Sequence, residues 1–301
     1  MESEIRQSIL KTVLYSDIFD YPTTAAQIWK YLISSRKIER EDFDKVLKNI
    51  KGPIKEQEGW YFLSGRENLI KKRLRRRKES QRKIAQAYKT ASILSIIPTV
   101  LLIGVSGGTS MHNADKNDDI DFFIIARENT IWQTRFFSVL ALTLLRRYRK
   151  RSLRIVADKI CLNMLVDESG LTFPEDRQDL YTAHEIVQMK PIFNKHKTYE
   201  KFILANKWVE NFLPNSIMIN DKGFSSRAEV ERMKSKQQQV ATAYLLFAVE
   251  FLVKEIQLWY IKRHVTLETV SNEMLAFHPS DYKIKVMQAY EARLKKYEQK
   301  I

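Results

Sequence analysis

Hydrophobic residues at the start of the chain recur every three or four positions, and this spacing predicts helices. Three such segments come first, and two short apolar runs around Gly59 then predict strands. The predicted helices cover residues 5–15, a segment capped by Thr23 or Thr24, and Glu41–Ile50, and the predicted strands cover Ile54–Glu58 and Trp60–Leu63. Together these elements predict a small N-terminal module of three helices followed by a hairpin.

The middle of the chain combines one long helical pattern with short apolar runs. Leu69–Ile97 predicts a helix that is polar and basic at first, turns apolar near its end and stops before Pro98. The apolar runs predict buried strands, and a helix rich in Phe, Leu and Trp separates the last two. These strands cover Val100–Val105, Ile120–Ala126 and Ile160–Val166, and the helix covers Thr130–Tyr148.

From Arg177 onward the pattern predicts only helices. One of them carries apolar residues on one side, which indicates a buried stripe. The stripe consists of Leu245, Leu246, Val249, Leu252, Val253, Ile256 and Trp259. The sequence therefore predicts an α/β protein in four parts. Residues 1–66 are similar to winged helix-turn-helix modules, 67–98 form a basic helical connector, 99–176 an α/β core and 177–301 a helical region.

Composition excludes several classes of protein. With 44% hydrophobic residues in 301 positions, the chain can bury real cores, so wholesale disorder is excluded. The single cysteine, Cys161, excludes an internal disulfide framework and a cysteine-rich zinc module. The longest apolar stretch, Val240–Val249, is far shorter than the ~20 residues that span a bilayer. The charged first residues are unlike a signal peptide, so we expect a soluble, cytoplasmic protein.

Positive charge is concentrated in two stretches. The chain has 51 Lys and Arg against 36 Asp and Glu, a formal net charge of +15. Lys71–Lys83 holds nine basic residues and one acid, and Arg146–Arg154 holds six basic residues and no acid. Clusters of this kind favour a polyanionic partner, so both stretches are candidate contacts for nucleic acid. The alternative is that they are solvated helix faces.

The most site-like segment is a glycine-rich turn followed by paired carboxylates. Three of the eight glycines lie in Gly104–Thr109, directly after a predicted strand, where backbone amides can approach phosphate oxygens. Asp119 and Asp121 follow on the next strand, and strand alternation places both on one face. Paired carboxylates repel each other unless a cation lies between them, and oxygen ligands suit Mg²⁺. This layout is typical of phosphoryl transfer.

Residues 100–126 resemble the core of the DNA polymerase β-like nucleotidyltransferase superfamily, whose signature is a Gly-Ser turn followed by Asp-x-Asp. The resemblance extends over Val100–Asp167 and implies a nucleotidyltransferase-type mixed sheet. It also implies an activity, the Mg²⁺-dependent transfer of a nucleoside monophosphate from an NTP. Gly107 matches the first position of the turn, and Asp119 and Asp121 match the metal-binding pair.

The sequence departs from the family pattern at three positions. Gly108 stands where the family has a serine, and Ser106, Thr109 or Ser110 could supply that hydroxyl instead. His112 replaces a later glycine. At the third carboxylate the strand offers Cys161 or Asn163, and Asp158 is the nearest acid.

The predicted function is Mg²⁺-dependent nucleotidyl transfer from an NTP to an unidentified acceptor. Asp119 and Asp121 are the predicted metal-binding and catalytic residues. The predicted contacts of the nucleotide are Ser106, Gly107, Gly108, Thr109 and Ser110. The alternative is a nucleotide- or nucleic-acid-binding regulator on a catalytically degenerate version of the same fold.

Overall fold

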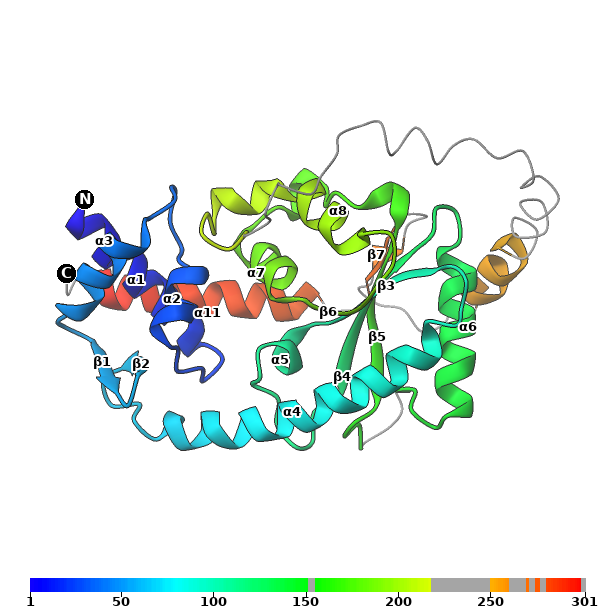
Figure 1. Ribbon diagram of the computed structural model, residues 1–301, viewed down its shortest axis with the longest axis horizontal. Coiled ribbons are helices and arrows are strands. Elements are labelled where there is room, and N and C mark those ends of the chain that lie inside the picture. Colours follow the sequence, from blue (N-terminus) through cyan, green and yellow to red (C-terminus); the bar gives the residue numbers. More distant parts are fainter. Residues whose placement is uncertain (151–154, 218–249, 260–268, 271–273, 277–279, 299–301) are drawn as a thin grey trace.

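The N-terminal module contains all five elements that its pattern predicts. The computed structural model describes residues 1–150, 155–217, 250–259, 269–270, 274–276 and 280–298 (Figure 1). The module's helices are α1 (Glu2–Asp17), α2 (Ala25–Lys30) and α3 (Arg40–Lys48), and β1 (Ile54–Gln57) pairs antiparallel with β2 (Trp60–Leu63). Thr24 caps α2 through a reciprocal pair of hydrogen bonds with Gln27, which satisfies backbone amides that the first helical turn leaves unpaired.

A single long helix connects this module to a central mixed sheet. Helix α4 (Leu69–Leu94) runs from the β1–β2 hairpin along one side of the sheet (Figure 1). The sheet has the strand order β6-β3-β4-β5-β8-β7. Its strands are β3 (Val100–Val105), β4 (Ile120–Ala126), β5 (Ile160–Asp167), β6 (Lys190–Asn194), β7 (Thr269–Val270) and β8 (Met274–Ala276). Among the strands that the structure describes, only β4 and β5 pair in parallel, and α6 (Ile131–Leu144) lies between them in the sequence.

The two faces of the sheet pack against different helices. Ile103 and Ile124 belong to a core that α4 and α6 complete. Leu102 and Ile125 belong to the other core, which includes residues of α7 (Leu180–Gln188) and α8 (Thr198–Ala205). Because neighbouring strand residues face opposite sides, the apolar runs predicted for β3 and β4 supply both cores at once. The remaining short elements are α5 (Gly107–Ser110) and the 3₁₀ turns η1 (Glu168–Gly170), η2 (Glu175–Arg177) and η3 (Lys207–Asn211).

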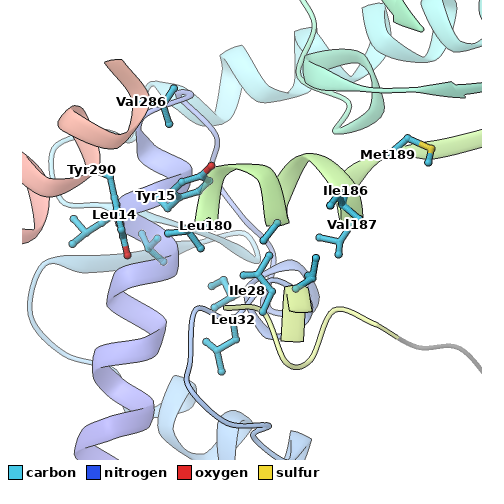
Figure 2. Packing of buried hydrophobic residues seen from close by; sticks show 14 of the residues in the cluster. Leu14, Tyr15, Ile28, Leu32, Leu180, Ile186, Val187, Met189, Val286 and Tyr290 are labelled. Atoms are coloured by element: carbon cyan, nitrogen blue, oxygen red, sulfur yellow. The ribbon is translucent and has the colours of Figure 1, made fainter. Parts of the chain in front are cut away.

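The two ends of the described chain share a core. Figure 2 shows Leu14 and Tyr15 of α1 next to Leu180 of α7 and Tyr290 of α11 (Ser280–Glu298). The rings of Tyr15 and Tyr290 meet edge to face, with centroids 5.4 Å apart. A hydrogen-bonded ion pair of 3.0 Å between Arg293 Nε and Asp17 Oδ2 joins the same two helices. The N-terminal module is therefore held against the rest of the molecule by apolar packing and by charge.

The region after Arg177 contains strands, so the prediction that it is entirely helical is wrong. Strand β6 pairs with β3, and β8 pairs with β5, so residues from this region extend the sheet on both sides. Strand β6 was missed because Pro191 within it is typical of a break rather than of a strand, whereas β8 and β7 have only three and two residues. A period of two cannot be recognised in so few positions.

The predicted apolar stripe is also wrong over the part that the structure describes. Leu252, Ile256 and Trp259 are 63%, 55% and 59% exposed, and Val253 alone of the stripe is buried there. The other three stripe residues lie outside the described residues. Helix 250–259 instead attaches to α6 through polar groups: Glu250 accepts hydrogen bonds from the backbone of Trp132 and Gln133 at 2.8 Å. Among the described helices, we find none that combines the length and hydrophobicity needed to cross a membrane.

Candidate functional site

The sheet brings both predicted aspartates together with the only cysteine of the chain. In the parallel pairing of β4 and β5, Asp121 lies directly opposite Cys161. Asp119 comes two positions before Asp121, so the same strand face carries it. One carboxylate oxygen of each aspartate and the Cys161 Sγ all lie within 4.8 Å of one another. These three ligand atoms are close enough to hold one metal ion.

The glycine turn reaches this cluster. Beyond the last β3–β4 pair, the Ser106 N–H donates to the Asp121 backbone carbonyl at 3.0 Å. Gly107 then adopts a positive φ of 61°, and a Cβ at this position would lie 3.0 Å from Asp121 Oδ2. A side chain at position 107 would therefore be strained by the backbone and crowded by the carboxylate. The turn continues into the short helix α5 rather than forming an open loop.

The hydroxyl groups of the turn differ in what they contact. Ser110 Oγ donates to the Gly107 carbonyl at 2.8 Å, so it stabilises the turn itself. Thr109 is buried. Ser106 is also buried, and its Oγ has no hydrogen-bond partner within the described part of the chain. Of these three hydroxyls, Ser106 is the one that lies opposite Asp121 and lacks a partner in the described part of the chain.

Arg149 places a positive charge beside the cluster. Its Nη1 lies 2.8 Å from Asp119 Oδ2 and 3.4 Å from Cys161 Sγ. The residue belongs to the predicted basic stretch Arg146–Arg154, of which 151–154 lie outside the described residues. Part of the repulsion between the two carboxylates is therefore offset by the protein's own guanidinium group.

Burial makes the charged forms of the cluster costly. Burial raises the pKa of Asp121 to about 8, and the nearby negative charges of Asp119 and Glu185 add to this effect. Burial also raises the pKa of Asp119, although Arg149 opposes it. The thiol pKa of Cys161 rises to about 12, through burial and then the two carboxylates. In the metal-free protein burial thus favours the protonated forms of Asp121 and Cys161, and a bound cation would favour their ionised forms.

Glu185 is a third acid near the cluster that sequence patterning did not identify. It lies on α7, which packs beside α5. Burial raises the pKa of Glu185 to about 7. The sequence pattern does not predict that Glu185 lies near the cluster, because α7 comes close to the site only through the packing of the core that it shares with α8. Its neighbour Tyr181, also on α7, has its pKa raised by burial and then by Glu185.

Asp158, the nearest acid to the third-carboxylate position, has a different role. Its Oδ1 accepts from Lys83 Nζ at 2.7 Å, and its carboxylate also binds Arg82. Lys83 is fully buried and donates to the Asp118 carbonyl at 2.6 Å as well. This arrangement joins α4 to the segments that enter β4 and β5, so Asp158 and Lys83 support the site without being members of the metal-ligand cluster.

The loop after the turn is held by α4 and by the N-terminal module. Arg73 donates to the carbonyl of His112 and, at 2.9 Å, to the Tyr21 hydroxyl, which in turn donates to the Met111 carbonyl. His112 has a positive φ of 56°. Burial lowers the pKa of its imidazole, and the charge of Lys190 lowers it further. His112, which stands where the sequence comparison expected a glycine, thus has a strained backbone conformation that the hydrogen bond from Arg73 stabilises.

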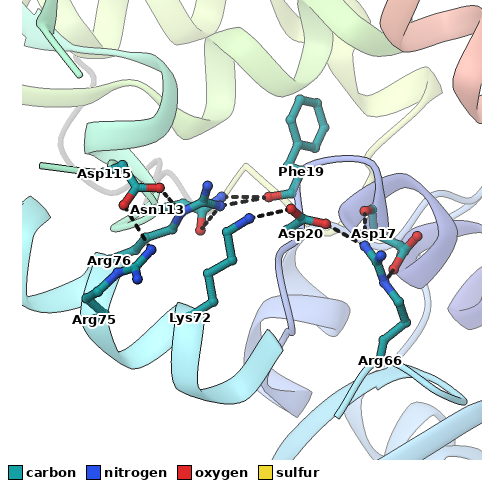
Figure 3. A network of polar contacts seen from close by, with 9 residues as sticks. All are labelled: Asp17, Phe19, Asp20, Arg66, Lys72, Arg75, Arg76, Asn113 and Asp115. Atoms are coloured by element: carbon teal, nitrogen blue, oxygen red, sulfur yellow. Dashed lines mark hydrogen bonds and ion pairs between the residues drawn. The ribbon is translucent and has the colours of Figure 1, made fainter. Parts of the chain in front are cut away.

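Much of the basic stretch Lys71–Lys83 forms ion pairs or hydrogen bonds with other parts of the same chain. Figure 3 shows Lys72 with Asp20 at 2.6 Å, and Arg75 and Arg76 with Asp115. Together with Arg73, Arg82 and Lys83, these account for six of the nine basic residues. The three others, Lys71, Arg77 and Lys78, are exposed. The concentration of charge therefore largely reflects ion pairs that fix α4 to the parts around it.

Comparisons of this chain with protein-family models, with curated proteins and with solved structures found no match. Any functional assignment therefore depends on the chemistry of Asp119, Asp121 and Cys161 and of the residues around them.

Proposed function

We propose that this protein transfers a nucleotidyl group from an NTP to an acceptor in a reaction that depends on a divalent cation such as Mg²⁺. The observation that carries the proposal is the contact between Gly107 and the Asp121 carboxylate. It puts the backbone of a glycine turn beside a pair of acids. Phosphate oxygens and a cation need both kinds of group at one place.

The order of the elements supports the same proposal. A strand, a glycine turn, a second strand, a helix and a third strand parallel to the second follow one another in β3, α5, β4, α6 and β5. This order agrees with a nucleotidyltransferase-type mixed sheet. The three helices and hairpin of residues 1–66 likewise agree with a winged helix.

The residues present fit a magnesium ion through two of the three candidate ligands. Asp119 and Asp121 would hold it, because Mg²⁺ in nucleotide sites is bound by one or two carboxylates together with phosphates and water. The sulfur of Cys161 is a poor ligand for this ion. When bound, the cation would neutralise charge that develops on the transferred phosphoryl group. Gly107, Gly108 and Thr109 would contact the triphosphate, with Ser106 and Ser110 beside them.

A second candidate function is nucleotide binding without turnover. Two observations favour it: Cys161 is opposite Asp121, where the family has its third carboxylate, and Arg149 pairs with Asp119. A third carboxylate often activates the attacking hydroxyl, so its replacement by a neutral thiol would slow the chemical step more than binding. In this alternative the protein acts as a regulator that senses nucleotide or nucleic acid.

Incubation with each of the four NTPs, labelled at the α-phosphate, tests the proposal. The reactions contain Mg²⁺ or Mn²⁺, and both labelled product and pyrophosphate are measured, including label attached to the protein itself. We expect transfer that Asp119→Asn and Asp121→Asn abolish. Asp176→Asn, at an exposed acid of η2, serves as the matched control and should keep full activity. Nucleotide binding without pyrophosphate release would favour the second candidate, and absence of both would refute the two together.

A further inference from the structure

Three neighbouring strands contribute one polar side chain each to the same face of the sheet. Ser106 continues β3 opposite Asp121 of β4, and Cys161 of β5 pairs with Asp121 on the other side. Residues that lie directly opposite each other in a sheet project from the same face. Ser106, Asp121 and Cys161 therefore form a row across the sheet, and Asp119 lies directly before the start of β4, two positions from Asp121.

The hydroxyl of this row lacks a partner within the described part of the chain. Ser106 is 4% exposed, and its Oγ has no hydrogen-bond partner among the described residues. Asp119 Oδ2 is also buried, and it forms an ion pair of 2.8 Å with Arg149 Nη1. Buried polar atoms are nearly always satisfied in native proteins, so an unpartnered hydroxyl in the same row as the carboxylate and the thiol points to a ligand at this place.

The donor set determines which ligand this is. The cluster offers two carboxylate oxygens and one sulfur as metal ligands. The sulfur distinguishes between cations, because thiolates favour ions such as Zn²⁺ and Mg²⁺ prefers oxygen ligands. Zinc binds sulfur at about 2.3 Å and carboxylate oxygen at about 2.0–2.2 Å, commonly with three protein ligands in open sites. Ligand atoms within 4.8 Å of one another need only small side-chain movements to meet these distances.

We propose that Asp119, Asp121 and Cys161 form a three-ligand site for a thiophilic divalent cation of the zinc class, which it binds more tightly than Mg²⁺. Binding forms a metal–sulfur bond as the S–H bond of Cys161 breaks, and the thiol proton leaves to solvent. Asp119 and Asp121 bind through carboxylate oxygens, and waters leave the hydrated ion as the protein ligands enter. The fourth position stays open to water or substrate, beside Ser106 and the glycine turn.

This inference concerns the cation rather than the reaction, so it goes beyond the proposed function. It holds whether or not a nucleotide is transferred. If transfer does occur, the proposal identifies Cys161 as the residue that determines which metal supports it.

Cobalt(II) tests the site directly in the purified full-length protein. A Co²⁺–thiolate bond produces an intense near-ultraviolet charge-transfer band, and Cys161 is the only thiol in the chain, so the band can arise from this residue alone. We expect the band to appear with one Co²⁺ per chain, to be lost on adding one equivalent of Zn²⁺, and to persist in a hundredfold excess of Mg²⁺. Cys161→Ser should lower zinc affinity at least tenfold and leave Mg²⁺ affinity nearly unchanged, while Asp176→Asn should change neither.

A second measurement needs no variant. Alkylation of the single thiol is followed with no metal, with Zn²⁺ and with Mg²⁺, and we expect protection by Zn²⁺ only. Saturation with Co²⁺ without a thiolate band, or equal protection by Zn²⁺ and Mg²⁺, would overturn the proposal. A thiolate band without nucleotidyl transfer would refute the proposed function and support the metal site. Mg²⁺-dependent transfer without a thiolate band would do the reverse.

Discussion

Gly107 packs against Asp121 so closely that a Cβ at position 107 would lie 3.0 Å from the Oδ2 of that carboxylate. The same glycine has a φ of 61°, in the left-handed region that L-residues rarely adopt. Backbone conformation and side-chain contact therefore demand glycine at the same position. The neighbouring Gly108 is under neither constraint, because its Cβ would meet only ordinary contacts at 3.7 Å from Ala114.

Gly107→Ala should lower the free energy of unfolding by about 1 kcal/mol or more, from the strained backbone alone. The added methyl group should also displace the Asp121 carboxylate and weaken cation binding. Chemical denaturation measures the first effect and calorimetric titration with Zn²⁺ or Mn²⁺ the second. Gly108→Ala is the matched control for stability, and equal stabilities for the two variants would contradict the explanation.

Asp121→Asn should remove cation binding and leave the metal-free protein at least as stable as before. The side chain keeps its shape, and the amide avoids the cost of a buried negative charge. The pKa of Asp121 is higher in the folded protein than in the unfolded chain, whose carboxyl releases its proton above pH ~4. The free energy of unfolding that this group contributes therefore falls progressively as the pH rises from about 4 toward 8. The variant's advantage in melting temperature should thus be larger at pH 8 than at pH 5. Thermal melts at both pH values, with and without NTP and Mg²⁺, check the expectation. A nucleotide-induced shift as large as that of the unmodified protein would contradict it.

Arg149→Gln should strengthen binding of a divalent cation, roughly threefold to tenfold. The guanidinium group lies 2.8 Å from Asp119 and repels a second positive charge at the same place. Isothermal titration with Zn²⁺ at low ionic strength measures the change. Lys150→Gln alters the net charge equally at an exposed neighbouring position and should have little effect. Weaker binding in Arg149→Gln would mean that this arginine positions the carboxylates.

Asp158→Asn should destabilise the protein at pH 7 by about 2 kcal/mol, since it removes charged hydrogen bonds from Lys83 and Arg82. Burial opposes ionisation of Asp158, but these two cations outweigh it and lower the pKa to about 2. A carboxyl with a depressed folded pKa stabilises the protein above its unfolded pKa of about 4, and this contribution disappears as the pH falls toward 2. The difference between variant and unmodified protein should therefore shrink from pH 7 to pH 3. Urea titrations at both values test this, and an undiminished difference at pH 3 would count against the ion pairs.

Nucleic-acid binding by Lys71–Lys83, if it occurs, should depend most on its exposed basic residues that have no ion-pair partner within the described part of the chain. Replacing Lys71, Arg77 and Lys78 together by alanine should abolish salt-dependent gel-shift binding and leave the melting temperature unchanged. Arg76→Ala should instead lower the melting temperature, because Arg76 Nε lies 2.9 Å from Asp115. Binding by the triple variant equal to that of the unmodified protein at two salt concentrations would exclude this surface.

The sequence predicted the parts of the site that a single strand determines. Alternation along Ile120–Ala126 was enough to put Asp119 and Asp121 on one face, and the three central strands lie almost where their apolar runs indicated. The sequence pattern could not predict the residues that other strands and helices bring to these two aspartates. Cys161 faces Asp121 because of the register between β4 and β5, and Arg149 and Glu185 approach through packing that no local pattern encodes.

The contact between α1 and α11 also constrains the order in which this protein can fold. Asp17 and Arg293 are 276 positions apart, yet they form one ion pair over a shared apolar core. On a ribosome adding about 5–20 residues per second, α1 emerges long before the helix that covers it. Leu14 and Tyr15 therefore lack this part of their native packing until α11 has been synthesised. During that interval the nascent chain offers chaperones an apolar surface that the finished protein conceals.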